Sequence, residues 1–369
     1  MYSPFRHTAS IIWKKRPIHL TFFLTKRCNS KCPFCFYLKN APSIPHPAGE
    51  VDGGIDKSRE LSLEEIKRIS GSMGTLLWLA FSGGEIYLRD DLVEISKTFY
   101  ENNKPAVILY PTNGLLPEII RDRTGQILDY CKKSIVAVKL SLDGLNGKHD
   151  SLRNTPGSFD KTLKTYNLLK VFIDKYPNFE LGINTVFCSE NQDDMDEIID
   201  FVNRMDFIKT HTISLIRGNL PDKSYMDVDY RKYSHAIGRI EKNLKDKTSS
   251  IYRFKGARIK AAQDILQRRL INRTMIENTR LIPCFAGRLN IVLTETGDVY
   301  PCEILTDSFG NIKDYDYDIG KVMQTDNAKK ITDSIMNNEC FCTHECYFMT
   351  NILFNPKCYP ALAKEYFQL

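Results

Sequence analysis

Three cysteines close together place the strongest constraint on what this chain can be. Cys28, Cys32 and Cys35 follow an apolar run at residues 18–24 that is typical of a buried β-strand, and no other cysteine occurs before Cys131. An iron–sulfur cube normally takes four thiolate ligands. Three thiolates leave one iron open to a further molecule. The spacing therefore points to a cluster that acts as a reagent as well as an electron store.

Zinc is the alternative metal for these thiolates. Tetrahedral zinc in a structural site also needs four protein ligands. His19 and His46 are close in sequence, but neither has the spacing of a zinc finger. We therefore favour an iron–sulfur cluster, with zinc or a chance grouping of cysteines as the alternatives.

The motif C-x3-C-x2-C, with the aromatic Phe34 before its last cysteine, resembles the cluster motif of the radical SAM superfamily. The resemblance implies a [4Fe-4S] cluster whose open iron is chelated by the amino and carboxylate groups of S-adenosylmethionine. In that family an electron from the cluster breaks the S–C5′ bond, and the 5′-deoxyadenosyl radical takes a hydrogen atom from the substrate. It also implies that Phe34 belongs to the cofactor site and that an electron donor such as flavodoxin or ferredoxin supplies the cluster.

The composition excludes several other classes of protein. The 369 residues include 51 basic and 45 acidic side chains spread along the chain, and the net charge of +6 supports only a weak preference for anionic ligands. The basic stretch around Arg268 lacks aromatic interleaving, so we expect no nucleic-acid partner. No run approaches the ~20 apolar residues that span a bilayer, and the start has no signal-peptide core. We expect a cytoplasmic protein without a membrane span, and its 11 cysteines suggest metal or cluster ligation.

Strand-like and helix-like segments alternate through the first half of the chain. This order is typical of an α/β protein with parallel strands. We expect a partial (βα)6 TIM-like barrel, followed by a small C-terminal α+β cluster-binding domain made of a β-hairpin and helices. The expected strands span residues 18–24, 76–81, 106–110, 135–142, 181–187 and 211–216.

Local signals mark the first barrel helix and the boundaries of the regions. Ser62 and Glu65 form a capping-box pattern that predicts a helix start. The Pro-, Gly- and Asp-rich stretch between Asn40 and Glu60 is expected to be a surface loop. The expected regions are the barrel at 1–225 with its core at 17–218, a helical connector at 226–280 and the cluster-binding domain at 281–369.

The remaining motifs of the first half follow expected strands, where ligands bind in barrels and open α/β sheets. Phe81-Ser-Gly-Gly-Glu85 resembles the GGE motif of the same family, and the alternative is a plain turn. By this resemblance, Gly83 and Gly84 let backbone groups approach the methionine part of the cofactor. Glu85 would accept a charge-assisted hydrogen bond from the cofactor's ammonium group.

Two later strands carry further candidates for the cofactor site. Asn113, at the end of the third strand, is expected to face the pocket. Residues 141–159 resemble a signature of radical SAM proteins with C-terminal cluster domains. Ser141 and Asp143 alternate to the same strand face, and by this resemblance one or both contact the ribose of the cofactor. The alternative for Asp143 is a turn-forming residue before Gly144.

Three residues after the fifth and sixth strands have weaker signals. Cys188 could donate a hydrogen atom to a substrate radical, although free cysteines are more often small buried hydrophobes. Asn191 is expected to be the N-cap of the next helix. Arg217 lies at the edge of the cofactor site by its position after the sixth strand.

Cysteines return near the C-terminus around a predicted β-hairpin. The hairpin has its turn at residues 296–298 and brings Cys284 and Cys302 together, so both can bind one metal centre. This arrangement resembles the opening of the SPASM and twitch domains, in which such cysteines begin an auxiliary [4Fe-4S] site. A zinc ribbon is the alternative.

The last cysteines depart from the full SPASM pattern. They read C-x-C-x3-C at Cys340, Cys342 and Cys346, and six C-terminal cysteines cannot supply the eight thiolates of two fully cysteine-ligated cubes. We expect one auxiliary [4Fe-4S] cluster, completed by two of these three. Cys342 and Cys346 are preferred with Cys340 in reserve, Cys358 is expected to be structural, and His344 to lie outside the ligand set.

Together these motifs predict a radical SAM enzyme with an auxiliary cluster. Only 27 residues precede Cys28, which leaves no room for the leader-binding domain of many peptide-modifying relatives, so a small-molecule substrate is favoured. Oxidation, epimerisation and rearrangement all remain open. A peptide-modifying maturase is the alternative, and a non-catalytic iron–sulfur electron carrier or zinc-binding module is the alternative from another class.

Overall fold

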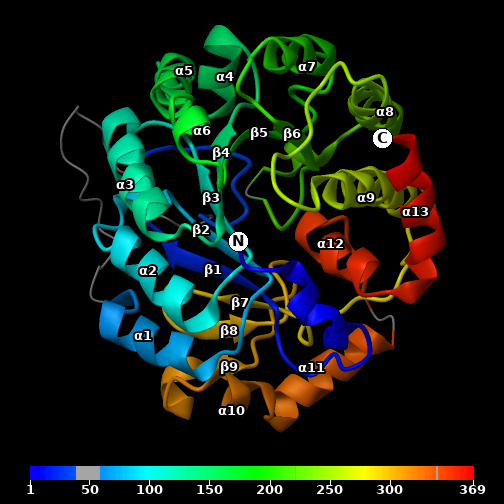
Figure 1. The fold of residues 1–369 in the computed structure, drawn as a ribbon. Coiled ribbons are helices and arrows are strands. Elements are labelled where there is room, and N and C mark those ends of the chain that lie inside the picture. Colours follow the sequence, from blue (N-terminus) through cyan, green and yellow to red (C-terminus); the bar gives the residue numbers. More distant parts are fainter. Residues whose placement is uncertain (39–58, 221, 338–339) are drawn as a thin grey trace.

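One nine-stranded sheet organises the molecule, as the ribbon in Figure 1 shows. This is a computed structural model of the chain, and it describes residues 1–38, 59–220, 222–337 and 340–369. The strands are β1 His19–Thr25, β2 Trp78–Gly83, β3 Val107–Thr112, β4 Ile135–Ser141, β5 Phe179–Phe187, β6 Thr210–Leu215, β7 Asn290–Leu293, β8 Asp298–Tyr300 and β9 Gly310–Asn311.

The sheet order is β6-β5-β4-β3-β2-β1-β7-β8-β9. Strands β1 to β6 pair in parallel, and helices lie around their outer side (Figure 1). The six strands expected from the sequence are therefore all present, each with bounds close to the predicted ones. The structure confirms the α/β class and the barrel-like arrangement.

Helices follow the strands and cover the sheet. The two helices expected in the connector are α8 and α9. Of the C-terminal helices, α12 and α13 pack against α9, whereas α10 contacts α1 and α11 (Figure 1). The helices are α1 Leu63–Ser72, α2 Leu92–Asn103, α3 Pro117–Tyr130, α4 Asn146–Leu152, α5 Ser158–Leu169, α6 Phe172–Lys175, α7 Met195–Asn203, α8 Tyr230–Lys245, α9 Ala257–Glu277, α10 Ile319–Met323, α11 Asp326–Met336, α12 Glu345–Leu353 and α13 Tyr359–Gln368.

The alternation of β1 explains how the barrel has both a core and a cavity. Every residue of β1 is buried. Leu20, Phe22 and Leu24 point to the helices and join the main hydrophobic core. His19 and Thr21 point to the other face and line the interior cavity. Successive side chains of a strand alternate between faces, so one short run of residues serves both surfaces.

The C-terminal hairpin continues the sheet of the barrel. Strand β7 pairs in parallel with β1, from His19 opposite Asn290 to Phe22 opposite Leu293. Strands β7 and β8 form the predicted antiparallel hairpin. The sheet thus runs without a break across the boundary expected at residue 281, and the division into regions remains a prediction.

The predicted start of the first barrel helix is confirmed. Ser62 is the N-cap of α1, with its hydroxyl accepting from the Glu65 amide and the Glu65 carboxylate accepting from the Ser62 amide. The surface loop expected between Asn40 and Glu60 lies outside the described residues, except for Arg59 and Glu60.

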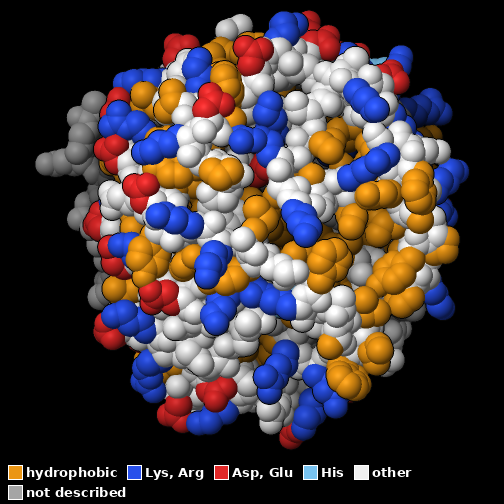
Figure 2. All heavy atoms as spheres, viewed as in Figure 1, with side chains coloured by type: hydrophobic (Ala, Val, Ile, Leu, Met, Phe, Trp, Pro, Cys, Tyr) orange, Lys and Arg blue, Asp and Glu red, His pale blue; other side chains and the backbone are white. Residues whose placement is uncertain are grey.

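Charged side chains are dispersed over the surface. On the face shown in Figure 2, Lys and Arg side chains alternate with acidic and apolar ones and form no single broad patch. Within the described residues, no helix combines the length and apolar character needed to cross a membrane.

Replacing Ser62 with alanine is expected to loosen α1. The loss of the side-chain cap costs about 1 kcal/mol, which accelerates amide exchange in α1 roughly fivefold. Hydrogen–deuterium exchange with mass spectrometry measures this effect. Thr98→Ala is the control, because its hydroxyl bonds only the carbonyl of Glu94 on the exposed side of α2. Equal exchange of α1 in the two variants would contradict the capping role.

Candidate active site

A cavity of about 390 Å³ inside the barrel collects the predicted cofactor residues. They come from loops after different strands, because the carboxyl ends of parallel strands meet at the same end of a barrel. The predicted residues that line this cavity are Cys28, Cys32, Phe34, Cys35, Gly83, Gly84, Glu85, Asn113 and Ser141.

The three cysteines after β1 sit in a loop held by polar contacts. The Cys35 amide donates to the Cys32 carbonyl at 3.1 Å, and the side-chain Nδ2 of Asn113 lies 3.8 Å from the Cys28 sulfur. Burial raises the pKa of the Cys28 and Cys35 thiols. Metal binding deprotonates such thiols, and three of them converging on one cavity fit a cluster with one open iron.

The glycine turn after β2 packs directly against this loop. The Gly84 amide donates to the Thr25 carbonyl at 2.7 Å, and the Glu85 amide donates to the Arg27 carbonyl at 2.8 Å. A Cβ at Gly84 would lie 2.1 Å from the Arg27 oxygen and 3.1 Å from the Cys28 Cβ. The absence of a side chain at Gly84 therefore lets the turn approach the backbone that leads into Cys28.

Glu85 lies at the bottom of the turn with its carboxylate nearly fully satisfied. Oε1 accepts from the Tyr87 amide and the Thr112 hydroxyl, and Oε2 accepts from the Asn113 amide at 2.8 Å. Burial raises the pKa of Glu85 to about 7, against the lowering effect of these hydrogen bonds. A carboxylate has about four acceptor positions, so three donors leave room for one more. This arrangement fits the predicted contact with an ammonium group.

Ser141 and Asp143 have different surroundings. Ser141 lines the cavity. Asp143 is fully buried outside the cavity lining, where its carboxylate accepts from the Arg153 guanidinium and the Val186 amide, both at 2.8 Å. The ribose contact remains a prediction for both, and the geometry leaves Ser141 as the side chain that faces the cavity.

Cys188 and Asn191 belong to the wall of the barrel. Cys188 is fully buried in an apolar cluster with Phe34 and Ile216, and it is not among the residues that line the cavity. Its role as a hydrogen donor stays a prediction. The N-cap prediction for Asn191 is wrong, because Asp194 occupies the N-cap position of α7, without a side-chain capping hydrogen bond. The Asn191 side chain instead ties the loop together, accepting from the Cys188 amide at 2.9 Å.

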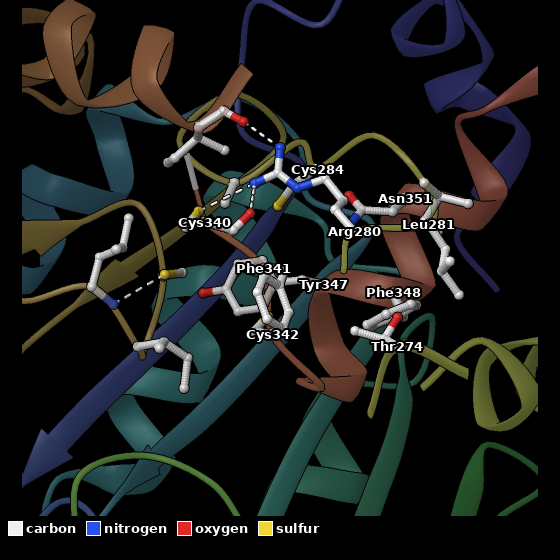
Figure 3. Close-up of a pocket in the computed structure, with 16 residues that line it drawn as sticks. Thr274, Arg280, Leu281, Cys284, Cys340, Phe341, Cys342, Tyr347, Phe348 and Asn351 are labelled. Carbon is white, nitrogen blue, oxygen red and sulfur yellow. Dashed lines mark hydrogen bonds between the residues drawn. The ribbon is translucent and has the colours of Figure 1, made fainter. Parts of the chain in front are cut away.

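A second, smaller cavity of about 50 Å³ gathers four cysteines of the C-terminal region (Figure 3). They are Cys284, Cys302, Cys340 and Cys342. Burial raises the pKa of Cys302 to about 12 and that of Cys342 to about 11. The Leu305 amide donates to the Cys302 sulfur at 3.3 Å. Four thiols in a mostly apolar pocket with donors to sulfur fit the ligand set of one iron–sulfur cube.

The structure places Cys346 away from these four. It lines the barrel cavity, on the first turn of α12. The fold therefore brings Cys340, and not the preferred Cys346, together with the other three cysteines. Cys358, expected to be structural, is buried and accepts a hydrogen bond from Asn355.

His344 contacts Glu303, which lines the barrel cavity and directly follows Cys302 of the four-cysteine pocket. Its ring is fully buried, with Nε2 2.6 Å from the Glu303 carboxylate and Nδ1 accepting from the Cys346 amide. Burial opposes ionisation of Glu303, but its hydrogen bond with His344 and the nearby Arg217 guanidinium lower its pKa to about 2. His344 thus contacts a neighbour of Cys302 and is not among the residues that line the four-cysteine pocket.

Sequence analysis gave no role to two glutamates that hold Arg217. The Arg217 guanidinium lies 3.1 Å from Glu345, 3.6 Å from Glu303 and over the ring of Phe36. Phe36 directly follows Cys35, and Glu303 directly follows Cys302. The positions of Phe36 and Glu303 next to cluster cysteines could have suggested a role near the site. Spacing along the chain does not show, however, that both contact Arg217.

Comparison with known proteins identifies the family. Residues 22–202 match the Radical SAM superfamily. The chain belongs to the radical SAM superfamily. It is therefore a radical SAM enzyme, a class that uses a [4Fe-4S] cluster, S-adenosylmethionine, a reductant and a substrate.

Two curated relatives match most of this radical SAM chain. The AdoMet-dependent heme synthase of Methanosarcina barkeri is 24% identical over 306 residues, which cover 81% of this chain and 80% of the relative. The antilisterial bacteriocin subtilosin biosynthesis protein AlbA of Bacillus subtilis is 28% identical over 88% of this chain. The match covers 65% of AlbA, just under two thirds of its length.

Solved structures share the fold. The structure of native anSMEcpe with bound AdoMet and Cp18Cys peptide has a TM-score of 0.59 at 19% identity, covering 95% of this chain and 96% of that one. Streptococcus suis SuiB bound to S-adenosylmethionine has a TM-score of 0.57 at 15% identity, covering 86% of this chain and 68% of that one. The cysteine-rich C-terminal region fits an auxiliary cluster domain of the SPASM type.

Gly84→Ala is expected to disrupt the cluster loop. The new Cβ would collide with the Arg27 carbonyl, so reconstituted protein should lose about four of roughly eight irons per chain. Iron analysis after anaerobic reconstitution measures this. Gly71→Ala in α1 is the control, since its Cβ meets nothing within 4 Å. A Gly84→Ala protein with full iron content would show that the turn does not position the cysteines.

The four-cysteine pocket predicts which thiols bind the auxiliary cluster. Cys340→Ser should lower the iron content by up to about four per chain, and Cys346→Ser should leave it unchanged. Iron and sulfide analysis and Mössbauer spectra of the two variants provide the measurement. The reverse outcome would restore the preference for Cys346.

Proposed function

We propose that this radical SAM enzyme reductively cleaves S-adenosylmethionine and uses the resulting radical to take a hydrogen atom from a small-molecule substrate. The carrying observation is that Cys28, Cys32 and Cys35 share one buried cavity with the acceptor Glu85. When bound, the cluster and cofactor would supply a 5′-deoxyadenosyl radical. The protein's part is to hold three cluster thiolates, to fix the cofactor's ammonium with Glu85 and to exclude water.

The auxiliary [4Fe-4S] cluster belongs to the same proposal. Its candidate ligands are the four cysteines that line the second cavity, Cys284, Cys302, Cys340 and Cys342. An auxiliary cluster could accept an electron from a substrate radical in an oxidation, or position the substrate. The proposed reaction is an oxidation, an epimerisation or a rearrangement of the substrate.

The substrate class rests on the shape of the site. A cavity of about 390 Å³ inside the barrel suits a small molecule. A peptide is the second candidate, supported by the similarity to AlbA, a subtilosin biosynthesis protein, and by the fold shared with anSMEcpe, which is seen with a peptide. The proposal includes a cytoplasmic location and reduction by a small electron carrier such as flavodoxin or ferredoxin.

The first test combines iron content with cofactor cleavage. Reconstituted wild type should hold roughly eight irons and form 5′-deoxyadenosine when reduced in the presence of S-adenosylmethionine. A Cys28→Ala/Cys32→Ala/Cys35→Ala variant should keep about four irons and form none.

Other results would redirect the proposal. Roughly four irons in wild type with cleavage intact would assign the C-terminal cysteines to zinc. Bound iron with no cleavage under any reductant, with candidate substrates present, would favour a non-catalytic electron carrier. A modified peptide after co-expression with a short neighbouring reading frame would replace the small-molecule substrate.

A further inference from the structure

The interior wall of the barrel has an apolar side and a polar side. On β2 and β3 the residues that line the cavity include Trp78, Ala80, Val107 and Leu109. On β4 to β6 they include Lys139, Ser141, Glu180, Asn184, Thr212 and Ser214. Ser82 and Thr112 also line the β2 and β3 side, so a substrate in this cavity would meet most, but not all, of its hydrogen-bonding groups on β4 to β6.

Lys139 is a half-buried lysine on the polar side. It precedes Ser141 by two residues on β4, so both side chains point into the cavity. Its ammonium group donates to the hydroxyls of Thr210 and Thr212, which are neutral. Among the described residues, no carboxylate lies within ion-pairing distance of it. Burial lowers the pKa of Lys139 to about 7, the cost expected of an ammonium held away from water.

The carboxylates near Lys139 bond to other groups. Asp264 pairs with Lys260 and accepts from the Tyr252 hydroxyl, and one oxygen of Glu180 accepts from the Arg253 amide, while its Oε2 is buried without a hydrogen-bond partner. Asp264 and Glu180 affect the pKa of Lys139 only by Coulombic interaction, without a direct hydrogen bond to it. A buried charge is normally paired, so a lysine that lines a cavity without a counter-ion points to an anionic ligand.

The backbone makes space for this ammonium group. Gly182 lies opposite Lys139 on β5, and a Cβ there would be 2.5 Å from the Lys139 nitrogen. Glycine inside a strand weakens it, and here it leaves room for another group's close approach.

A second cation, Arg268 on α9, lines the same cavity, and its Nη2 donates to the His211 carbonyl. The Nη1 atom of Arg268 on α9 is buried with no hydrogen-bond partner. The unpaired Nη1 is an independent observation from a different element of the fold. Lys139 and Arg268 give the polar side two cationic groups that protein acceptors do not fully satisfy.

We propose that Lys139 binds a carboxylate or phosphate group of the substrate, with Arg268 adding positive potential. This rests on the proposed function, since it takes the barrel cavity to be the substrate site. Two residues of a strand span about 6.6 Å. The anion would therefore lie about that far from Ser141 along β4, toward the start of the strand.

The test titrates simple anions into the reconstituted enzyme with S-adenosylmethionine bound. Sulfate stands for a phosphate group and acetate for a carboxylate, each added at constant ionic strength and followed by calorimetry. Wild type should bind one of them saturably, and Lys139→Met should bind it at least tenfold more weakly. Lys132→Met is the matched control, because Lys132 is exposed and lies on the same segment before β4. Lys139→Gln provides a second neutral variant if the first does not fold.

The outcomes separate this inference from the proposed function. Preference for sulfate assigns a phosphate group, and preference for acetate assigns a carboxylate. Equal affinity in wild type and both Lys139 variants, or no saturable binding of either anion to wild type, would overturn the role of Lys139. Failure of wild type to form 5′-deoxyadenosine would instead count against the proposed function, and the anion titrations would still decide what Lys139 binds.

Discussion

The hydrogen bonding of β1 to two parallel neighbours is the constraint on which the site depends. One neighbour, β2, leads into the glycine turn, and the other, β7, leads into the hairpin turn, where Glu295 pairs with Lys26. The loop with Cys28 leaves the strand between them. Three segments that are far apart in sequence therefore emerge side by side, and their relative positions are set by backbone pairing rather than by flexible side chains.

Arg217 adds a link between the two cysteine groups. Its guanidinium contacts Phe36, which follows the first group, and pairs with Glu303 and Glu345, which flank cysteines of the second region. A guanidinium has five donors in a rigid plane, so it can hold several partners at fixed angles. The two sites are thus connected by a buried charge network as well as by the sheet.

The sequence predicted the strands and the cofactor residues because these depend on local patterns. Alternating apolar runs located β1 to β6, and motifs at strand ends collected in one cavity. The sequence did not predict which of Cys340 and Cys346 lies in the four-cysteine pocket. Cys342 lies in an extended loop, whereas Cys346 lies in the first turn of α12, and the helix turns it toward the barrel. Spacing along the chain does not encode that change of direction. The N-cap prediction for Asn191 was wrong for a similar reason. The turn after β5 continues for three more residues, so the N-cap position of α7 is Asp194.

The sheet has free edges at β6 and β9, so strands do not enclose the whole cavity. Side chains of α9 and α12, among them Asp264, Arg268 and Cys346, line part of the cavity alongside the strands. A wall of strands resists change, because each residue also belongs to a hydrogen-bonded ladder. A wall of helix side chains can be replaced one residue at a time. This side of the barrel is where new substrate preferences can arise without disturbing the part that holds the cofactor.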